Sequence, residues 1–429
     1  MTSSICGETK PYSWVIEKPH GEIMKDYYCA IDIGSSLCHV LVGRPQADGS
    51  VEVIGVGTAP SRGVRTGSIV NIEATIQAIA EAAREAELMS GLVVEEACVN
   101  ITGKHLHGGN SRGVVAITNK DRVVQHADVL RVIEGAQNIR IPGDQEVIHV
   151  LSREFAVDDQ KGIKDPIGMT GIRLEAEVHI VSASITALTN LNKSVMGAGI
   201  QVTGGVMSSL ASGEAVLTEG EKELGVAVID IGGGISDVVI YVEGGVFYSA
   251  VVPLGGIHIT QDLSIGLKVP VEIAEVVKKN YGSARVAIVD PTERIELPGM
   301  SGRASRQVLR QEVAEIIEPR VQEILQLVDS ELVRSGKKGF LAGGVVLTGG
   351  TAHLEGIEET AEDVLALTVA ARSPLGVEGF VDRVSGPEFA TGVGMLHYQS
   401  RLADSPEVIE SRPTVGVVSK IKNWIAENL

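Results

Sequence analysis

The phrase IDIG occurs twice in this chain, at residues 31–34 and again at residues 229–232. Each copy ends a short apolar segment and is followed by further segments with the alternation of β-strands. Helical patterns come later in both halves, for example over residues 71–89 and 307–334. Self-similarity of this kind indicates an internal duplication of one fold. We therefore expect an α/β protein with two related lobes.

Composition excludes several classes of protein. The chain has 429 residues, enough for two to four domains, and a formal net charge of −18. Such an acidic body repels nucleic-acid phosphates, so no nucleic-acid partner is expected. The four cysteines form no CxxC pair, which argues against structural zinc and a disulfide framework and fits a reducing cytoplasm. No apolar run reaches about 18 residues, so no membrane span is expected. Glu8, Glu17 and Glu22 stand where a signal peptide would need a basic and then an apolar stretch, so no signal peptide is expected either.

The two glycine turns carry the chemistry of an anion site. A glycine-rich hairpin can point several backbone N–H groups at one anion, and an aspartate at the strand end can hold a hydrated Mg²⁺ beside it. The first hairpin spans residues 32–36 (DIGSS), and the second spans residues 230–237 (DIGGGISD). Either hairpin alone is weak evidence for a phosphate site, because such a turn is more often an ordinary hairpin. Both together, followed by LTGG at 347–350, indicate a clamp on a nucleotide phosphate chain.

This arrangement resembles the actin-like ATPase superfamily and, more narrowly, the FtsA family of bacterial cell division proteins. The resemblance covers about residues 27–400 and the terminal helix. The stretches that carry it are VGTAPSRGVRTGSIVN (56–71), EFAVDDQKGIKDPIGMTGIRLEAEVHIV (154–181), LASGEAVLTEGEKELGVAVIDIGGGISDVVIY (210–241), EVAEIIEPR (312–320), VVLTGGTAHLEGI (345–357) and ATGVGMLHY (390–398).

The resemblance implies an actin-like two-lobed fold of duplicated ribonuclease-H-like domains, with ATP and Mg²⁺ bound between the lobes. It also implies an inserted FtsA-type α/β subdomain and a C-terminal amphipathic helix. The expected divisions are a tail (1–26), a first lobe (27–102, 179–208 and 385–400), the inserted subdomain (103–178), a second lobe (209–254 and 336–384) with its small subdomain (255–335), a linker (401–414) and the amphipathic helix (415–429).

Site residues follow from the resemblance position by position. Asp32 and Asp230 are expected to place Mg²⁺ through water. Glu275 and Lys278 match the position that touches ribose and adenine, although on their own they would be interpreted as a solvated i,i+3 salt bridge. The remaining expected contacts are Gly34, Ser35 and Ser36 in the first phosphate loop, Gly232, Gly233 and Gly234 in the second, and Gly349 and Gly350 in the adenosine motif.

Two further positions concern catalysis. Glu214 lies in the segment where relatives that hydrolyse ATP carry the residue that positions the attacking water, but it could equally be an exposed acid on a helix. Leu37 stands where several relatives carry a lysine in the first phosphate loop. Loss of that cation removes transition-state stabilisation more than ground-state binding. The resemblance therefore implies ATP binding with at most slow ATPase activity.

The function implied is an ATP-binding scaffold that polymerises at the cytoplasmic face of the inner membrane and tethers FtsZ filaments there during septum assembly. The alternatives are a pilus-assembly scaffold and a metabolite kinase, neither of which needs an amphipathic tail. In residues 415–429 apolar side chains recur at helical spacing around Trp424, which favours binding at a lipid interface. The expected partners are lipid, other copies of the chain, later division proteins at the inserted subdomain, and the FtsZ C-terminal peptide at residues 255–335, where Arg285, Arg303, Arg306 and Arg310 are candidate contacts.

Overall fold

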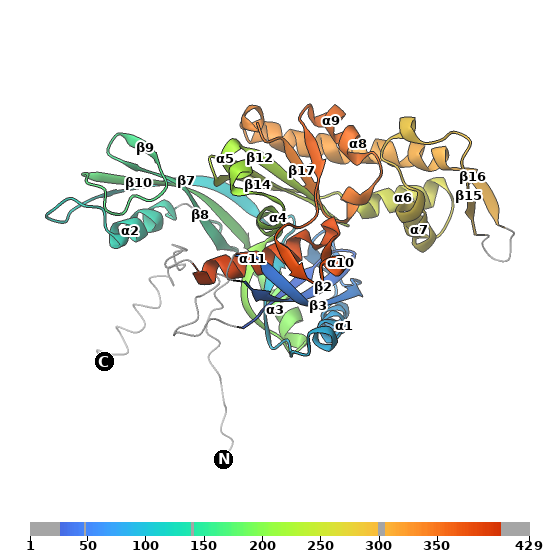
Figure 1. Cartoon of the computed structure of the whole chain (residues 1–429), viewed down its shortest axis with the longest axis horizontal. Helices are drawn as coiled ribbons and strands as arrows, with labels where there is room; N and C mark the ends of the chain where they lie inside the picture. The colour runs from blue at the N-terminus through green and yellow to red at the C-terminus, as the bar shows by residue number, and fades with distance from the viewer. Residues whose placement is uncertain (1–25, 47–48, 139–140, 299–304, 405–429) are drawn as a thin grey trace, which may run out of the picture.

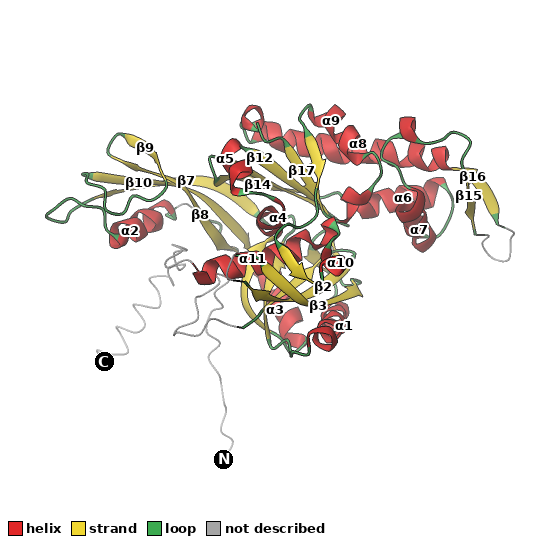
Figure 2. Cartoon of the chain, in the orientation of Figure 1, coloured by secondary structure: helices red, strands yellow, loops and turns green. Residues whose placement is uncertain are grey.

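The computed structural model of the chain describes residues 26–46, 49–138, 141–298 and 305–404. Two lobes lie one above the other in Figure 1, with a smaller α/β unit projecting from the left and a helical subdomain projecting to the right. Each lobe contains its own β-sheet, and helices flank the sheets (Figure 2). The expected α/β fold, with two lobes and an inserted unit, is therefore confirmed.

The first lobe is built on a six-stranded mixed sheet. In spatial order its strands are β11 (Gln201–Met207), β6 (Glu96–Ile101), β1 (Tyr28–Ile33), β2 (Leu37–Pro45), β3 (Val51–Pro60) and β19 (Val377–Gly379). β1, β2 and β3 form an antiparallel meander, while β6 runs parallel to β1 and β11 parallel to β6. Helices α1 (Ile72–Ser90) and α3 (Ile185–Gly197) and the hairpin of β4 (Val64–Arg65) and β5 (Ser68–Ile69) complete the lobe.

The second lobe repeats this topology. In spatial order its strands are β14 (Gly245–Val252), β13 (Ser236–Val242), β12 (Val226–Ile231), β17 (Val345–Thr348) and β18 (Val369–Ala371). β12, β13 and β14 form the antiparallel meander, β17 runs parallel to β12, and β18 runs parallel to β17. β1 and β12, which carry the two IDIG phrases, occupy equivalent places, so the predicted duplication is present in the strand order. Helix α9 (Ile357–Leu365) packs against this lobe.

The inserted unit is an antiparallel sheet covered by one helix. Its strands in spatial order are β7 (His107–Ala116), β10 (Arg173–Ser184), β8 (Gln145–Val157) and β9 (Gln160–Ile163), and its helix is α2 (His126–Ala136). Val129, Val132 and Ile133 of α2 belong to a separate hydrophobic core with residues of this sheet. β10 runs through the expected boundary at 178 and leads at Ile185 directly into α3 of the first lobe.

The small subdomain of the second lobe is mostly helical. It contains α6 (Gly256–Gly266), α7 (Val271–Tyr281), α8 (Arg310–Arg334) and the hairpin of β15 (Arg294–Leu297) and β16 (Arg306–Leu309). The helical pattern predicted a helix from residue 307, but residues 306–309 pair with β15 and the helix begins at Arg310. The predicted start of the helix was wrong because these residues pair with a distant strand, and helical spacing in the sequence carries no information about such pairing.

Three helices lie where the chain passes between the lobes. α4 (Ser208–Val216) and α5 (Glu219–Leu224) lead from the first lobe to the second, and α11 (Ala390–Asp404) follows the return, after the short helix α10 (Val381–Val384). α4 and α11 pack so closely that a Cβ on Gly394 would lie 1.8 Å from the Ala211 carbonyl oxygen. Only glycine fits this crossing without moving one of the helices.

In the described ranges, no helix is both long enough and apolar enough to cross a membrane. The predicted amphipathic helix at 415–429 lies outside the described residues. The same holds for residues 1–25 of the predicted tail and for most of the predicted linker.

Candidate functional site

The two glycine hairpins adopt the same turn in the two lobes. The Gly34 N–H donates to the Leu37 carbonyl oxygen at 3.0 Å, and the Gly232 N–H donates to the Ile235 carbonyl oxygen at 3.0 Å. In each hairpin an aspartate lies two residues before the glycine, at the end of a buried strand. The repeated phrase in the sequence therefore corresponds to a repeated local structure.

These hairpins meet at the junction of the lobes. A Cβ added to Gly233 would lie 2.1 Å from Ser36 Oγ, and one added to Gly234 would lie 2.6 Å from Ser35 Oγ. Ser35 Oγ also accepts a hydrogen bond from the Gly67 N–H at 3.2 Å, which fixes the first loop to the β4–β5 hairpin. The structure thus brings together the serines and glycines that the sequence assigned to the two phosphate loops.

Three buried carboxylates lie behind these loops. Asp32, Asp230 and Asp237 are each less than a tenth exposed, and Asp230 lies opposite Asp237 in the β12–β13 register. Thr102 Oγ1 donates to Asp237 Oδ1 at 2.7 Å, from the first lobe to the second. Asp237 closes the second hairpin in the sequence, but its place in the acid cluster, and that of Thr102, were not predicted. Both depend on contacts between distant segments.

Burial and mutual repulsion raise the pKa values in this cluster. Burial is the larger cause for Asp32, followed by the charges of Asp230 and Asp237, and together they raise its pKa to about 8. Burial and the Asp230 charge raise the pKa of Asp237 to about 8, against the Thr102 hydrogen bond. Burial also raises the pKa of Asp230, while hydrogen bonds from Ser212 and Thr391 oppose it. Clustered acids of this kind are stabilised in the charged form by a cation.

The acid cluster supplies carboxylate oxygens that a hydrated cation could contact. Within the described residues, no group of three histidine, cysteine or acidic side chains is arranged to hold a metal ion. Carboxylate oxygens are nevertheless the ligands that Mg²⁺ prefers, and Mg²⁺ commonly keeps several of its waters. Asp32 and Asp230 supply such oxygens, and their contact with Mg²⁺ through water stays a prediction.

Glu275 and Lys278 form more than a solvated pair. The Lys278 Nζ lies 2.8 Å from Glu275 Oε2, donates to the Gly256 carbonyl oxygen at 3.0 Å, and is nearly buried. The Gly256 N–H in turn donates to the Gly232 carbonyl oxygen at 3.0 Å, which links α7 through α6 to the second loop. Burial is the largest influence and would raise the pKa of Glu275, but the charge and hydrogen bond of Lys278, the Thr260 hydrogen bond and the charge of Lys279 together lower it.

The adenosine motif lies against the same loop. Gly349 has φ +83°, and a Cβ there would lie 2.2 Å from Asp230 Oδ1. The Thr351 hydroxyl donates to the Gly232 carbonyl oxygen at 3.2 Å. Gly350 begins the short 3-10 turn that contains Thr351. The structure therefore places Gly349 beside Asp230 and Thr351 against the second phosphate loop.

Glu214 is held in a different place. It lies on α4, and its Oε1 is 3.2 Å from Lys222 Nζ and 3.4 Å from an Arg401 nitrogen. Its side chain is only 9% exposed, so it is not the exposed helix acid that the sequence left open. The partners of Glu214 come from α5 and α11, whereas Ser212 on the same helix contacts Asp230. A catalytic role for Glu214 stays a prediction, and this geometry favours a structural one.

The first loop offers no substitute for the missing lysine at Leu37. The next charged candidate along β2 is His39, which is 4% exposed. Burial lowers the pKa of His39 to about 4. This histidine is therefore neutral at pH 7 and cannot supply a positive charge beside the phosphates.

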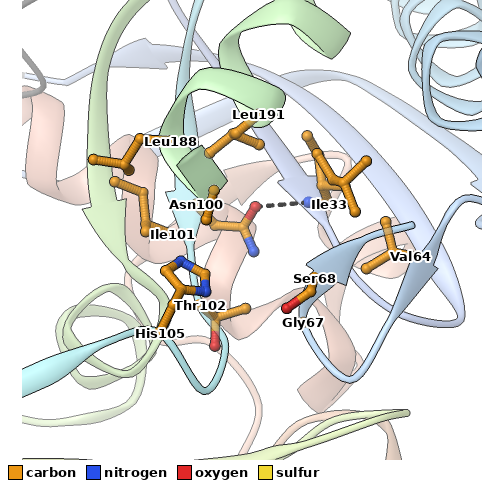
Figure 3. Close-up of a pocket in the computed structure, with 12 residues that line it drawn as sticks. Ile33, Val64, Gly67, Ser68, Asn100, Ile101, Thr102, His105, Leu188 and Leu191 are labelled. Atoms are coloured by element: carbon orange, nitrogen blue, oxygen red, sulfur yellow. Dashed lines mark hydrogen bonds between the residues drawn. The ribbon is translucent and has the colours of Figure 1, made fainter. Parts of the chain in front are cut away.

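A small cavity adjoins the first loop from the side of the first lobe (Figure 3). Its volume is about 30 Å³, which accommodates one or two water molecules and not a nucleotide. Asn100, which lines it, accepts a hydrogen bond from the Ile33 N–H at 2.8 Å and donates to Ser208 Oγ at 3.2 Å. Asn100 thereby connects the base of the first phosphate loop to the start of α4.

Comparison with known proteins places this geometry in a family. The model of cell division protein FtsA matches residues 227–394, and the model of the SHS2 domain inserted in FtsA matches residues 103–182. Cell division protein FtsA of Pseudomonas aeruginosa is 41% identical over 406 residues, covering 93% of this chain and 97% of that protein.

Solved structures show the same fold at lower identity. The PilM-PilN type IV pilus biogenesis complex contains a chain with a TM-score of 0.63 at 16% identity, covering 88% of this chain and 99% of that chain. MreB5 of Spiroplasma citri bound to ADP has a TM-score of 0.52 at 13% identity, covering 88% and 97%. With the family models and the near full-length relative, these findings show that the chain belongs to the FtsA family and is an actin-like cell division protein.

Proposed function

We propose that this chain binds Mg-ATP between its lobes and uses it to polymerise at the cytoplasmic face of the inner membrane, where it tethers FtsZ filaments to the membrane during septum assembly. The observation that carries the nucleotide part is the meeting of two glycine hairpins, one from each lobe, over three buried carboxylates. Backbone N–H groups of the hairpins bind the phosphates, and Asp32 and Asp230 hold the hydrated Mg²⁺. Family membership across nearly the whole chain disfavours the pilus scaffold and the metabolite kinase.

Hydrolysis in this site is expected to be slow. Leu37 provides no charge for the transition state, and Glu214 is engaged with Lys222 and Arg401. Neither feature weakens the binding of ATP in its ground state by the backbone loops. The nucleotide therefore acts mainly as a ligand that brings the lobes together and favours assembly.

Calorimetric titration with ATP and Mg²⁺ tests the site. Gly233→Asp should abolish binding, because the new side chain would collide with Ser36 Oγ and place a negative charge where the phosphates bind. Gly143→Asp is the matched control, since a Cβ there meets nothing within 4 Å. Equal ATP affinity in both variants would show that the two hairpins do not form the site.

The FtsZ C-terminal peptide is proposed to bind the small subdomain, residues 255–335. Arg285 pairs with Asp363 at 2.6 Å, and Arg310 pairs with Glu293 at 3.1 Å. Reversing either charge would therefore disturb internal contacts of the fold as well as any partner. Arg306 is exposed on β16, where it donates to a backbone carbonyl, and it is the better candidate for direct contact; Arg303 lies outside the described residues.

A peptide-binding assay tests the Arg306 contact. Arg306→Glu should weaken binding of a fluorescent FtsZ C-terminal peptide, with Arg84→Glu on the exposed face of α1 as the control. Unchanged affinity in Arg306→Glu would remove this residue from the interface. Loss of affinity in both variants would point to net charge and not to a defined contact.

The membrane contact is proposed for residues 415–429. Trp424 suits the headgroup boundary, and Lys420 and Lys422 add roughly 1 kcal/mol each at an anionic surface. One short helix anchors weakly, but a polymer carries many, and avidity can raise attachment by about 10² to 10⁴. In co-sedimentation with anionic vesicles and ATP, Trp424→Glu should release the protein, while Trp424→Phe should stay bound. Retention of Trp424→Glu on vesicles without any partner would contradict the tether.

The inserted subdomain is proposed to contact later division proteins and neighbouring copies of the chain. Val114 on β7 and Ile172 are each more than half exposed on this unit, which leaves apolar surface available to a partner. Pull-down of the cytoplasmic segments of membrane division proteins with Val114→Asp tests this part, and full retention of binding would exclude this edge.

A further inference from the structure

Two hydroxyl groups converge on one oxygen of Asp230. Ser212 Oγ donates to Asp230 Oδ2 at 2.6 Å, and Thr391 Oγ1 donates to the same oxygen at 3.1 Å. The two hydroxyl oxygens lie 3.0 Å apart. Ser212 is fully buried and Thr391 is 5% exposed, so water does not compete for these hydrogen bonds. Neither residue was predicted as part of the site.

These hydroxyls come from the two segments that connect the lobes. Ser212 lies on α4, which follows β11 of the first lobe, and Thr391 lies at the start of α11, which packs on β1 and β2 of the first lobe. Asp230 itself lies one residue before the end of β12 of the second lobe. One carboxylate of the second lobe is therefore held by both crossings of the chain.

The other carboxylate oxygen is left in a defined position. Asp230 Oδ1 faces Gly349, where a Cβ would approach it to 2.2 Å. With Oδ2 fixed by two donors, rotation of the carboxylate would break both hydrogen bonds at once. Hydroxyl donors also differ from lysine or arginine, because they orient an acid without neutralising it and so leave its charge available to a cation.

We propose that Ser212 and Thr391 are positioning residues that fix the Asp230 carboxylate for the hydrated Mg²⁺ of the bound nucleotide. The proposal rests on the proposed Mg-ATP function and names the side chains that orient its metal contact. It predicts that the two hydroxyls matter for ATP bound with Mg²⁺ and matter little for ATP bound by the glycine hairpins alone.

The test is a titration of ATP into the full-length protein, in excess Mg²⁺ and separately in EDTA. Thr391→Val removes the hydroxyl at nearly constant volume, and Thr391→Ser keeps it. Ser212→Ala removes the second donor, and Ser209→Ala, at a buried serine on the same helix, is the matched control. Circular dichroism confirms that each variant is folded, and the Thr391 pair suffices if Ser212→Ala does not fold.

We expect Thr391→Val and Ser212→Ala each to lose about tenfold or more in affinity for Mg-ATP, since a hydrogen bond to a charged group is lost. Affinity in EDTA should change by less than about twofold, and Thr391→Ser should retain Mg-ATP binding. Equal losses with and without Mg²⁺, a Thr391→Ser variant as weak as Thr391→Val, or Mg-ATP affinities equal to that of Ser209→Ala would overturn the inference. If wild-type protein bound no ATP under either condition, the proposed function would fail first and this inference with it.

Discussion

His179 makes the contact between the inserted subdomain and the second lobe sensitive to acid. It lies on β10, where Nε2 is 2.9 Å from Ser249 Oγ on β14 and Nδ1 is 2.7 Å from Asn110 Oδ1 on β7. Burial, and then the charge of Arg153 on β8, lower the pKa of His179 to about 4. The folded state thus holds a neutral imidazole that becomes protonated readily only after this contact opens.

The size and sign of the effect follow from linkage. The ordinary histidine pKa of 6.5 and the folded value of about 4 differ by an amount worth roughly 3 kcal/mol at 1.36 kcal/mol per pKa unit. Because the folded pKa is depressed, the opened state binds the proton more readily. The contribution of neutral His179 to the free energy of opening is therefore complete above pH 6.5, and it is lost as the pH falls toward 4. At pH 5 the loss is roughly 2 kcal/mol.

The pH dependence of the His179 contact has to be measured locally, because protonation of the acid cluster changes the stability of the folded state in the opposite direction. The pKa values of Asp32 and Asp237 are raised to about 8, so the folded state binds protons more readily there and acidification stabilises it. Native-state hydrogen exchange of the β7 and β14 amides reports the opening of the His179 contact by itself. Opening free energies at pH 7 and pH 5, corrected for intrinsic exchange, give the required difference.

His179→Gln keeps a hydrogen-bonding side chain but cannot titrate. Between pH 7 and pH 5, the opening free energy of the wild-type protein should fall by about 2 kcal/mol more than that of His179→Gln. His107→Gln, at an exposed histidine on β7, is the matched control and should behave as wild type. The same pH dependence in wild type and His179→Gln would refute the argument.

Three other substitutions test the packing at the site and at the helices between the lobes. Gly349→Ala should reduce ATP affinity by tenfold or more in calorimetry, because φ +83° and the 2.2 Å approach to Asp230 Oδ1 both exclude a side chain. Lys222→Met should destabilise the protein by about 3 kcal/mol in chemical denaturation, since it removes one of two cations paired with nearly buried Glu214; an unchanged midpoint would mean that this ion pair is neutral overall. Gly394→Ala should cost at least 1 to 3 kcal/mol in the same assay by forcing α4 and α11 apart, and a neutral result would show that the helices separate freely.

The sequence predicted those parts of the molecule that depend on local pattern. The hairpins at Asp32 and Asp230, most strands and the long helices follow from periodicity and glycine turns, and the repeated phrase predicted the duplication. The start of α8 was wrong because residues 306–309 pair with β15, a contact that helical spacing does not encode.

The rest of the site depends on pairs of residues far apart in the chain. Thr102 meets Asp237 across 135 residues, and Ser212 meets Thr391 across 179 residues. A single serine or threonine gives no signal in a sequence without the fold that brings it to a carboxylate. Glu214 is the opposite case, a residue that the family resemblance suggested for catalysis. In the structure its side chain pairs with Lys222 and Arg401.

The contact of β7 with β14 also bears on how a chain of this kind can assemble safely. β14 is the outer strand of the second-lobe sheet and β7 that of the inserted sheet, and outer strands carry unpaired backbone groups that can template cross-β aggregation. Here the Asn110 side chain donates to the Phe247 carbonyl oxygen at 3.1 Å, and Arg153 covers the Phe247 ring, with its guanidinium carbon 4.2 Å from the ring centroid. These side chains thereby cover part of the edge that each sheet presents at β7 or β14. In the polymer that we propose, this part of the β7–β14 border therefore stays covered during assembly and disassembly, while the exposed Val114 end of β7 remains available to a neighbouring copy.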